Sequence, residues 1–458
     1  MTNNNISRRN FLKVLGLSSA AVATSSLISC NSNTEDETGA RSLASGKTKT
    51  GPMTTRIHPT NGDEVSILGY GCMRFPTLEN ADAEGNNVDQ EATNKLIDYA
   101  MEHGVNYYDT SPVYLRGFSE RATGIALKRH DRSKFFIATK LSNFSDYSYE
   151  NSVKMYKKSF EELQVDYIDY YLLHSVGGNI KNFEDRYINN GILDFLVKER
   201  EAGRIRNLGF SYHGNSQGYE HILNLHDKYK WDFVQIQLNY VDWIHESKNN
   251  NAEYLYNELE RRGIPAVIME PLLGGRLAKV NSAINTRMKS RRPQESIASW
   301  AFRFAGTPKG VLTVLSGMTY MEHLQDNINT YSPLEPCSQE EIEFLKETAA
   351  LMKQYPTIDC TQCQYCMPCP YGIDIPTIFE HYNKCVNEGN VAIDKQDTNY
   401  ARARRAYLVS YGRKVPRERQ ADHCIGCKKC IDLCPQHINI PKKMRQIDEY
   451  IEKLRREG

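Results

Sequence analysis

The sequence has no excess of either charge, and most of its length has little cysteine. Lys and Arg number 57 against 56 Asp and Glu, a net charge of +1. Nucleic-acid binding usually needs a basic face, so we expect no nucleic-acid partner. Of the 12 cysteines, nine lie in the last 99 residues. The cysteine-poor body excludes a disulfide-stapled scaffold, and the cysteine-rich tail indicates a metal-binding module.

Long apolar runs are also absent, except for one near the N-terminus. Residues 14–28 form a mildly apolar stretch of about 15 residues, which is too short to cross a bilayer core of about 30 Å comfortably. Arg8 and Arg9 precede it and are followed by Phe-Leu-Lys. This arrangement resembles a bacterial twin-arginine export signal. We therefore expect residues 1–30 to be a targeting signal.

The end of this signal resembles a lipobox. Residues 27–30 read Leu-Ile-Ser-Cys, in which Cys30 would be lipidated and become the mature N-terminus. An ordinary cleavage region with an incidental cysteine is the alternative. The polar residues 31–53 predict a flexible tether, which a lipid-held protein needs. We expect an exported protein on the periplasmic side, touching the membrane only through its signal or a lipid on Cys30.

Residues 54–335 alternate between strand-like and helical patterns eight times. A helix is expected over 89–103, for example, where apolar residues recur at helical spacing and Gly104 follows. Such alternation predicts a parallel sheet, and eight repeats favour an α/β fold, a closed (β/α)8 TIM barrel. A turn at residues 60–63 predicts a hairpin that plugs the bottom of the barrel. The predicted barrel strands are 67–71, 105–109, 135–139, 168–173, 206–210, 233–237, 264–269 and 311–315.

Four titratable residues follow successive predicted strands. Asp109 ends the second strand, Tyr114 comes soon after it, Lys140 ends the third strand, and His174 ends the fourth. Each one alone has an ordinary structural explanation, such as a helix cap or a solvated strand end. Active sites of (β/α)8 barrels lie at the carboxyl ends of the strands. The four together therefore predict a catalytic set.

The segment from 54 to 335 resembles the aldo-keto reductase family. The resemblance implies hydride transfer between NAD(H) or NADP(H) and a small carbonyl or alcohol substrate, with Tyr114 as proton donor. Lys140 would lower the pKa of Tyr114 from its usual value near 10, Asp109 would hold Lys140, and His174 would orient the substrate oxygen. The residues that carry the resemblance are 108–114, Ser119-Glu120, 137–140, 163–174, 203–211 and 235–240.

The same resemblance implies nucleotide contacts, with two departures from the usual pattern. Tyr212 stands where the family usually has Asn, and Met269 stands where a stacking Tyr is common. The loop after the last strand lacks the basic residues that favour a 2′-phosphate, so NADH is at least as plausible as NADPH. The implied contacts are Ser211, Gln235, Pro271, Leu272, Gly274, Ser316, Gly317, His323, Asp326 and Asn327.

The tail, residues 336–458, carries two ferredoxin-like cysteine runs. The second run has the spacing of bacterial [4Fe–4S] ligands, and the first differs only in its last interval. The runs predict a small, mostly α-helical domain with two clusters and crossed ligation, with helices at 378–387 and 399–411. Zinc and disulfides are the alternatives. The predicted ligands are Cys360, Cys363, Cys366, Cys369, Cys424, Cys427, Cys430 and Cys434.

Three cysteines of the body and tail have no predicted cluster role. Cys385 is a spare thiol near the predicted ligands, and Cys72 is expected to pack in the core. Cys337 precedes Ser338, which with Glu341 has the pattern of a helix capping box.

Two classes of function remain open at this point. The first is an exported oxidoreductase whose clusters exchange electrons with a redox partner protein. Free NAD(P)H is not expected outside the cytoplasm, so the nicotinamide would be retained, or the clusters would deliver the electrons. The second class is a non-enzymatic electron carrier that uses the barrel as a docking scaffold. Retention of the chain in the cytoplasm is a further alternative and would restore the ordinary supply of nucleotide.

Overall fold

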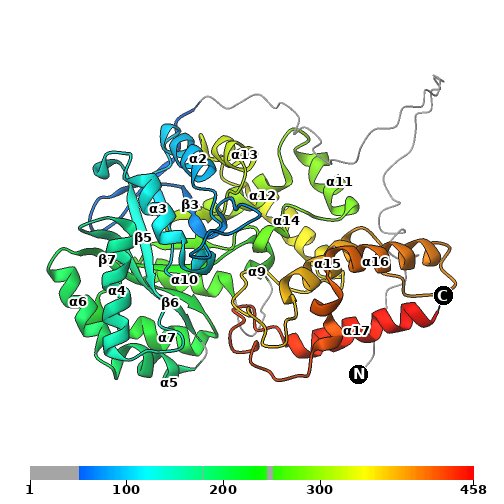
Figure 1. Cartoon of the computed structure of the whole chain (residues 1–458). Helices are drawn as coiled ribbons and strands as arrows, with labels where there is room; N and C mark the ends of the chain where they lie inside the picture. The colour runs from blue at the N-terminus through cyan, green and yellow to red at the C-terminus, as the bar shows by residue number, and fades with distance from the viewer. Residues whose placement is uncertain (1–50, 178, 245–250, 458) are drawn as a thin grey trace. The chain divides into compact units, whose positions relative to one another are not determined.

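The computed structural model describes residues 51–177, 179–244 and 251–457 (Figure 1). The predicted export signal, Cys30 and most of the tether lie outside these residues, so their interpretation stays a prediction. Within the described part of the chain, no helix is both long and apolar enough to cross a bilayer.

Eight parallel strands close into a barrel, in the spatial order β10-β3-β4-β5-β6-β7-β8-β9. The sheet closes where β10 pairs with β3, for example Val314 with Leu68. This confirms the predicted (β/α)8 barrel, and each predicted strand matches an observed one. The strands are β3 (Leu68–Gly71), β4 (Tyr107–Asp109), β5 (Phe136–Leu141), β6 (Ile168–Gly177), β7 (Ile205–His213), β8 (Phe233–Gln237), β9 (Ala266–Met269) and β10 (Val311–Ser316).

Helices surround the barrel and bury one face against it (Figure 1). In α2, the Asp89 side chain accepts a hydrogen bond from the Ala92 N–H and so caps the helix, while Leu96 and Ile97 are buried. The helices of this part are α2 (Gln90–Glu102), α3 (Ser119–Leu127), α4 (Tyr149–Leu163), α5 (Ile180–Phe183), α6 (Ile192–Glu201), α7 (Ser216–Asn224), α8 (His226–Tyr229), α9 (Tyr240–Ile244), α10 (Ala252–Arg262), α11 (Ser282–Arg291), α12 (Ile297–Gly306), α13 (Met321–Tyr331) and α14 (Gln339–Met352).

A hairpin covers the amino-terminal end of the barrel, as the turn sequence predicts. Its strands are β1 (Thr55–Ile57) and β2 (Glu64–Ser66), which pair antiparallel. Arg56 donates hydrogen bonds to the carbonyls of Gly306 and Lys309, just before β10 begins. Val65 packs inside the barrel against side chains of the strands. The hairpin therefore closes the end of the barrel opposite the predicted active site.

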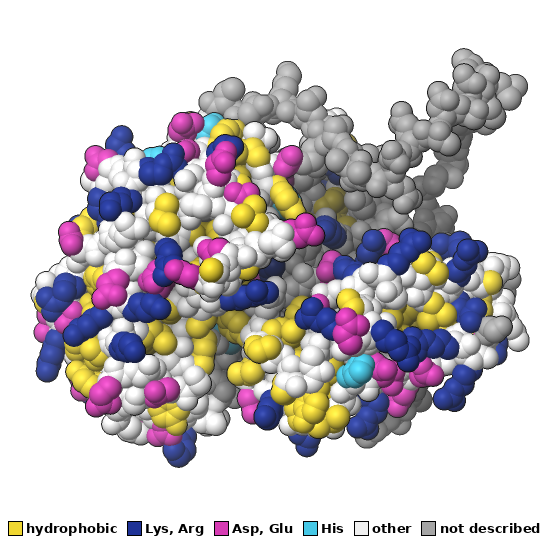
Figure 2. Space-filling view, viewed as in Figure 1, with side chains coloured by type: hydrophobic (Ala, Val, Ile, Leu, Met, Phe, Trp, Pro, Cys, Tyr) yellow, Lys and Arg dark blue, Asp and Glu magenta, His cyan; other side chains and the backbone are white. Residues whose placement is uncertain are grey.

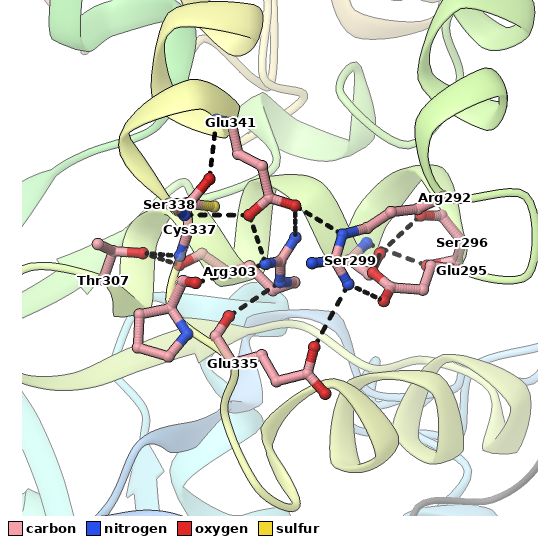
Figure 3. A network of polar contacts seen from close by, with 11 residues as sticks. Arg292, Glu295, Ser296, Ser299, Arg303, Thr307, Glu335, Cys337, Ser338 and Glu341 are labelled. Carbon is pink, nitrogen blue, oxygen red and sulfur yellow. Dashed lines mark hydrogen bonds and ion pairs between the residues drawn. The ribbon is translucent and has the colours of Figure 1, made fainter.

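Helix α14 belongs to the core of the barrel although it follows the last strand. Its Phe344 and Leu345 are buried in the same hydrophobic cluster as the barrel helices. At its start, Ser338 and Glu341 form the predicted capping box. Glu341 also accepts hydrogen bonds from Arg303 of α12, at 2.7 Å, and from Arg292, at 2.7 Å (Figure 3).

This network lowers the pKa of the Glu341 carboxyl group. Burial acts to raise its pKa, but the hydrogen bonds from Arg303, Arg292 and the Ser338 N–H outweigh it and lower the pKa to about 2. The Arg303 side chain is only 1% exposed, so its positive charge is stabilised by the Glu341 carboxylate and not by water.

We predict that Glu341→Gln lowers the free energy of unfolding by about 3 kcal/mol at pH 7, because it leaves the Arg303 cation without its buried partner. The pKa of Glu341 is depressed in the folded state, so its contribution is present above the unfolded value of 4.5 and is lost as pH falls to about 2. Urea unfolding at several pH values measures this. The control is Glu343→Gln on the same helix, since Glu343 is exposed and contacts Lys346 and Gln339 at the surface. An equal loss in both variants would contradict the prediction.

The tail forms a second core around three helices: α15 (Ile375–Asn387), α16 (Tyr400–Lys414) and α17 (Ile440–Arg456) (Figure 1). The two predicted helices of the tail are confirmed, and α17 is additional. The internal repeat in the sequence of the tail is also present in its structure. Asp374 and Asn439 each cap the helix that follows a cysteine run, and each helix has Pro in its first turn. The two cysteine runs thus enter their helices in the same way.

Candidate active site and cluster sites

The four predicted catalytic residues meet at the carboxyl end of the barrel. Asp109 is the last residue of β4, and Lys140 and His174 lie near the ends of β5 and β6. Tyr114 begins a short turn after β4, and its ring meets the His174 ring edge to face, with centroids 5.8 Å apart. Adjacent parallel strands place these side chains side by side, which is why the set could be read from strand ends alone.

Asp109 and Lys140 form a buried ion pair. The Lys140 Nζ donates to both Asp109 carboxylate oxygens, at 2.6 and 2.7 Å, and to the Thr110 carbonyl, at 2.8 Å. Burial raises the pKa of Asp109 and lowers that of Lys140, while their mutual attraction opposes both shifts. Lys140 is thereby pinned, with its Nζ 5.0 Å from the centroid of the Tyr114 ring.

The expected effect of Lys140 on Tyr114 is not found. The hydrogen bonds of the ammonium group go to Asp109 and Thr110 rather than to the phenol. Burial raises the pKa of Tyr114 well above its usual value, and the neighbouring Tyr365 and Asp109 raise it further. The phenol is therefore neutral at pH 7, the form in which it can donate a proton.

His174 is a neutral imidazole held from both sides. Burial lowers its pKa well below 6.5, and the nearby cations Lys140 and Arg186 add to this shift. Its Nδ1 lies 2.5 Å from the Ser142 Oγ, so that hydroxyl can fix the tautomer of the ring. Its Nε2 then faces the space beside Tyr114.

Tyr365, from the first cysteine run, fills that space. Its hydroxyl lies 3.0 Å from the His174 Nε2, and Tyr365 also lies close enough to Tyr114 to raise its pKa. Its ring meets the His174 ring edge to face and lies near Phe144. One oxygen atom thus hydrogen-bonds the neutral histidine and lies beside the predicted proton donor.

The eight predicted cluster ligands fall into two sets of four, each set taking three thiols from one run and one from the other. The first set lines one cavity together with apolar side chains such as Ile375 and Phe379. Burial and the neighbouring Cys434 thiol raise the pKa of Cys360 to about 11, and Cys430 is raised to about 11 by burial and its own three cysteine neighbours. The first set is Cys360, Cys363, Cys366 and Cys434, and the second is Cys424, Cys427, Cys430 and Cys369.

This grouping fits two cubes with crossed ligation, as the repeat predicts. No disulfide joins any cysteine of the described residues. Three cysteines lie apart from the two sets. Cys385 is buried beside His381 in the helical core, Cys72 is buried in the barrel, and Cys337 is buried beside Thr307.

Comparisons with known proteins agree with this division. The model of the Aldo/keto reductase family matches residues 67–350, more than half of the chain. The chain belongs to the aldo/keto reductase family. A 4Fe-4S dicluster domain matches residues 359–439, so this reductase carries an iron–sulfur domain behind its barrel.

Individual relatives resemble the barrel part of this aldo/keto reductase. It is 27% identical to "Uncharacterized oxidoreductase YqkF" of Bacillus subtilis over 64% of its own chain and 96% of the relative. It is 25% identical to L-galactose dehydrogenase of Arabidopsis thaliana over 64% of its own chain and 92% of the relative. A solved structure of aldo-keto reductase AKR11C1 from Bacillus halodurans, 22% identical, superposes with a TM-score of 0.52 over 65% of this chain and 96% of that one, which supports the fold.

The residues expected to bind the nicotinamide ring are in place in this reductase. Ser211 lies in β7 and Gln235 in β8, and both are buried. The Ser211 Oγ accepts a hydrogen bond from the Ser175 N–H. The Gln235 Oε1 has no hydrogen-bond partner among the described residues, which leaves an acceptor open for an amide group. This end of the nucleotide site fits the expected cofactor.

The loop expected to wrap the pyrophosphate does not fit. This loop, residues 271–275, includes Pro271, Leu272 and Gly274. The Gly274 N–H is donated to the half-buried side chain of Glu270 at 2.7 Å, so an anion would meet a carboxyl group there. The backbone of Thr361 lies against Gly274 so closely that a Cβ at Gly274 would be 2.3 Å from the Thr361 carbonyl oxygen. The first cysteine run therefore covers this loop.

The expected adenosine end is also engaged within the protein. Ser316 accepts a hydrogen bond from Asn327, and Asp326 accepts one from Ser296. The side chain of Arg74 packs over Gly317 and donates to the Thr361 carbonyl at 2.7 Å. His323 is half-buried against Tyr320, and burial lowers its pKa. With the pyrophosphate loop covered, the residues at this end are held by contacts within the protein.

Sequence reasoning missed two residues of the site. Tyr365 lies inside a Cys-x₂-Cys interval, where any residue is tolerated, so its place was hidden by the ligand spacing. Glu270 directly follows β9. An acidic residue at the carboxyl end of a barrel strand is a signal that the sequence offers for this position.

Crossed ligation predicts which cysteine substitutions remove the same cluster. Cys360→Ser and Cys434→Ser should each lower the iron content from about eight to about four atoms per chain, and the double variant should lose no more. Cys360→Ser combined with Cys424→Ser should lose both clusters. Iron and acid-labile sulfide, measured on anaerobically purified protein, decide this. Cys385→Ser is the control and should keep all its iron, and additive losses in the first double variant would exclude the crossed arrangement.

Proposed function

We propose that this reductase interconverts a small carbonyl compound and its alcohol, with Tyr114 as proton donor, and exchanges the electrons through its [4Fe–4S] clusters. The observation that carries the proposal is the oxygen atom of Tyr365, which hydrogen-bonds His174 and lies beside Tyr114. A substrate oxygen needs the same two partners. A docking scaffold has no use for such a pair, which argues against a purely electron-carrying protein.

Each residue of the set has a role that follows from its contacts. The neutral Tyr114 phenol gives a proton to the carbonyl oxygen as negative charge develops there. The Nε2–H of His174 donates a hydrogen bond to the same oxygen in the tautomer in which the Ser142 hydroxyl donates to Nδ1. Lys140 does not lower the pKa of Tyr114 in the resting site, but Asp109 holds its ammonium 5.0 Å from the centroid of the Tyr114 ring, where its positive charge offsets the negative charge left on Tyr114 once the proton has moved.

Reduction of a carbonyl to an alcohol consumes two electrons and two protons. When bound, each cluster carries one electron at a time, so two clusters match the electron count. Tyr114 supplies one proton, and solvent supplies the other. The electrons come from or pass to a redox partner protein outside this chain. Export by the twin-arginine route, with a lipid on Cys30, belongs to the same proposal and rests on residues 8–30.

We predict that Tyr114→Phe lowers turnover by at least about 100-fold, because Tyr114 gives the proton, and Tyr365, the other phenol at this place, must leave before substrate can bind. A reduced viologen dye can serve as the one-electron donor, with a panel of small aldehydes and sugars that includes L-galactose, the compound named for one relative. Iron content should stay unchanged, since Tyr114 is not a cluster ligand. The matched control is Tyr320→Phe, an exposed residue after β10. Turnover within a factor of two of the wild type in Tyr114→Phe would exclude the assigned proton donor.

A further inference from the structure

The first cysteine run lies over both halves of the expected cofactor and substrate site. Tyr365 fills the oxygen position between Tyr114 and His174, and the Thr361 backbone lies on the pyrophosphate loop at Gly274. These two contacts are four residues apart in one short segment, 359–366, which also supplies three ligands of the first cluster set. The segment is therefore placed by cluster ligands and by the barrel together.

Polar contacts hold this segment and its surroundings to the barrel. Arg276, which follows the pyrophosphate loop, donates to the Asp359 carboxylate at 2.9 Å and to the Thr357 hydroxyl at 2.9 Å. Arg276 is the cation of this loop that could otherwise meet a phosphate. From the second run, Gln436 exchanges two amide hydrogen bonds with Gln237, at the end of β8. These contacts thus neutralise the Arg276 cation and fill space that a dinucleotide would need.

We propose that segment 359–366 and a nicotinamide dinucleotide compete for the mouth of the barrel, so that the docked iron–sulfur domain excludes the nucleotide. The Thr361 carbonyl and the Glu270 carboxyl group take up the backbone space and the N–H that a pyrophosphate would need. Tyr365 takes the place of the substrate oxygen. The nucleotide binds only to the fraction of molecules in which the segment has withdrawn, and substrate likewise reaches Tyr114 and His174 only after Tyr365 leaves. This competition rests on the proposed function in one respect only, which is that Tyr114 and His174 bind the substrate oxygen.

The test is nucleotide affinity, which needs no turnover. NADH and NADPH are titrated separately into anaerobic, fully loaded protein, with binding followed by equilibrium dialysis. The released variant is Asp359→Ala, Tyr365→Ala and Gln436→Ala combined, which changes no cluster ligand and no residue of the barrel. We expect it to bind at least one of the nucleotides at least about tenfold more tightly than the wild type, since apparent affinity falls with the fraction of competent molecules.

A matched control and a second variant keep the outcome clear. Tyr371→Ala replaces an exposed tyrosine of the same domain and should leave affinity unchanged. If the triple variant loses iron, Asp359→Asn with Gln436→Leu tests the same docking without touching the Cys-x₂-Cys interval. Equal affinities in wild-type and released protein, whether both tight or both undetectable, would overturn the proposal. Failure of the assigned proton donor would appear instead as undiminished turnover in Tyr114→Phe, with these affinities unaffected.

Discussion

The closure of eight parallel strands into a ring is the constraint on which the rest of the site depends. When β10 pairs with β3, every strand must end at the same rim, and residues from β4, β5 and β6 are forced into contact there. The Asp109–Lys140 pair can be buried only because this rim also provides the Thr110 carbonyl as a third acceptor. The same rim provides the surface onto which the iron–sulfur domain packs its cysteine runs.

Two different sets of contacts hold the residues of the site in place. Around His174, small hydroxyl groups and a buried ion pair hold the reacting groups without a mobile charge nearby. Around the clusters, thiols from distant parts of the chain converge on two positions within an apolar shell. Tyr365 belongs to both regions. It directly precedes the predicted ligand Cys366, and its hydroxyl hydrogen-bonds His174. The predicted cluster site and the proposed proton-transfer site thus meet at Tyr365.

The sequence predicts those features that depend on local pattern. The barrel strands, the capping box at Ser338 and the strand-end set could be read because each is encoded within a few residues. Crossed ligation could be read because the two runs repeat one another. The hydrogen bonds of Lys140, and with them the pKa direction of Tyr114, depend on how neighbouring strands pack, which local pattern does not reveal. The position of Tyr365 depends on how two domains meet, and nothing in a Cys-x₂-Cys interval specifies it.

Crossed ligation also imposes an order on biosynthesis. The first cluster position takes Cys434, which leaves the ribosome 68 residues after Cys366, the last of its three other ligands. The barrel, with its own core complete near α14, is synthesised well before that. A nascent chain therefore has a barrel with an uncovered mouth until Cys434 has been made and has left the ribosome. Small molecules of the compartment of synthesis meet the barrel during that interval, before metal insertion fixes the segment that covers it.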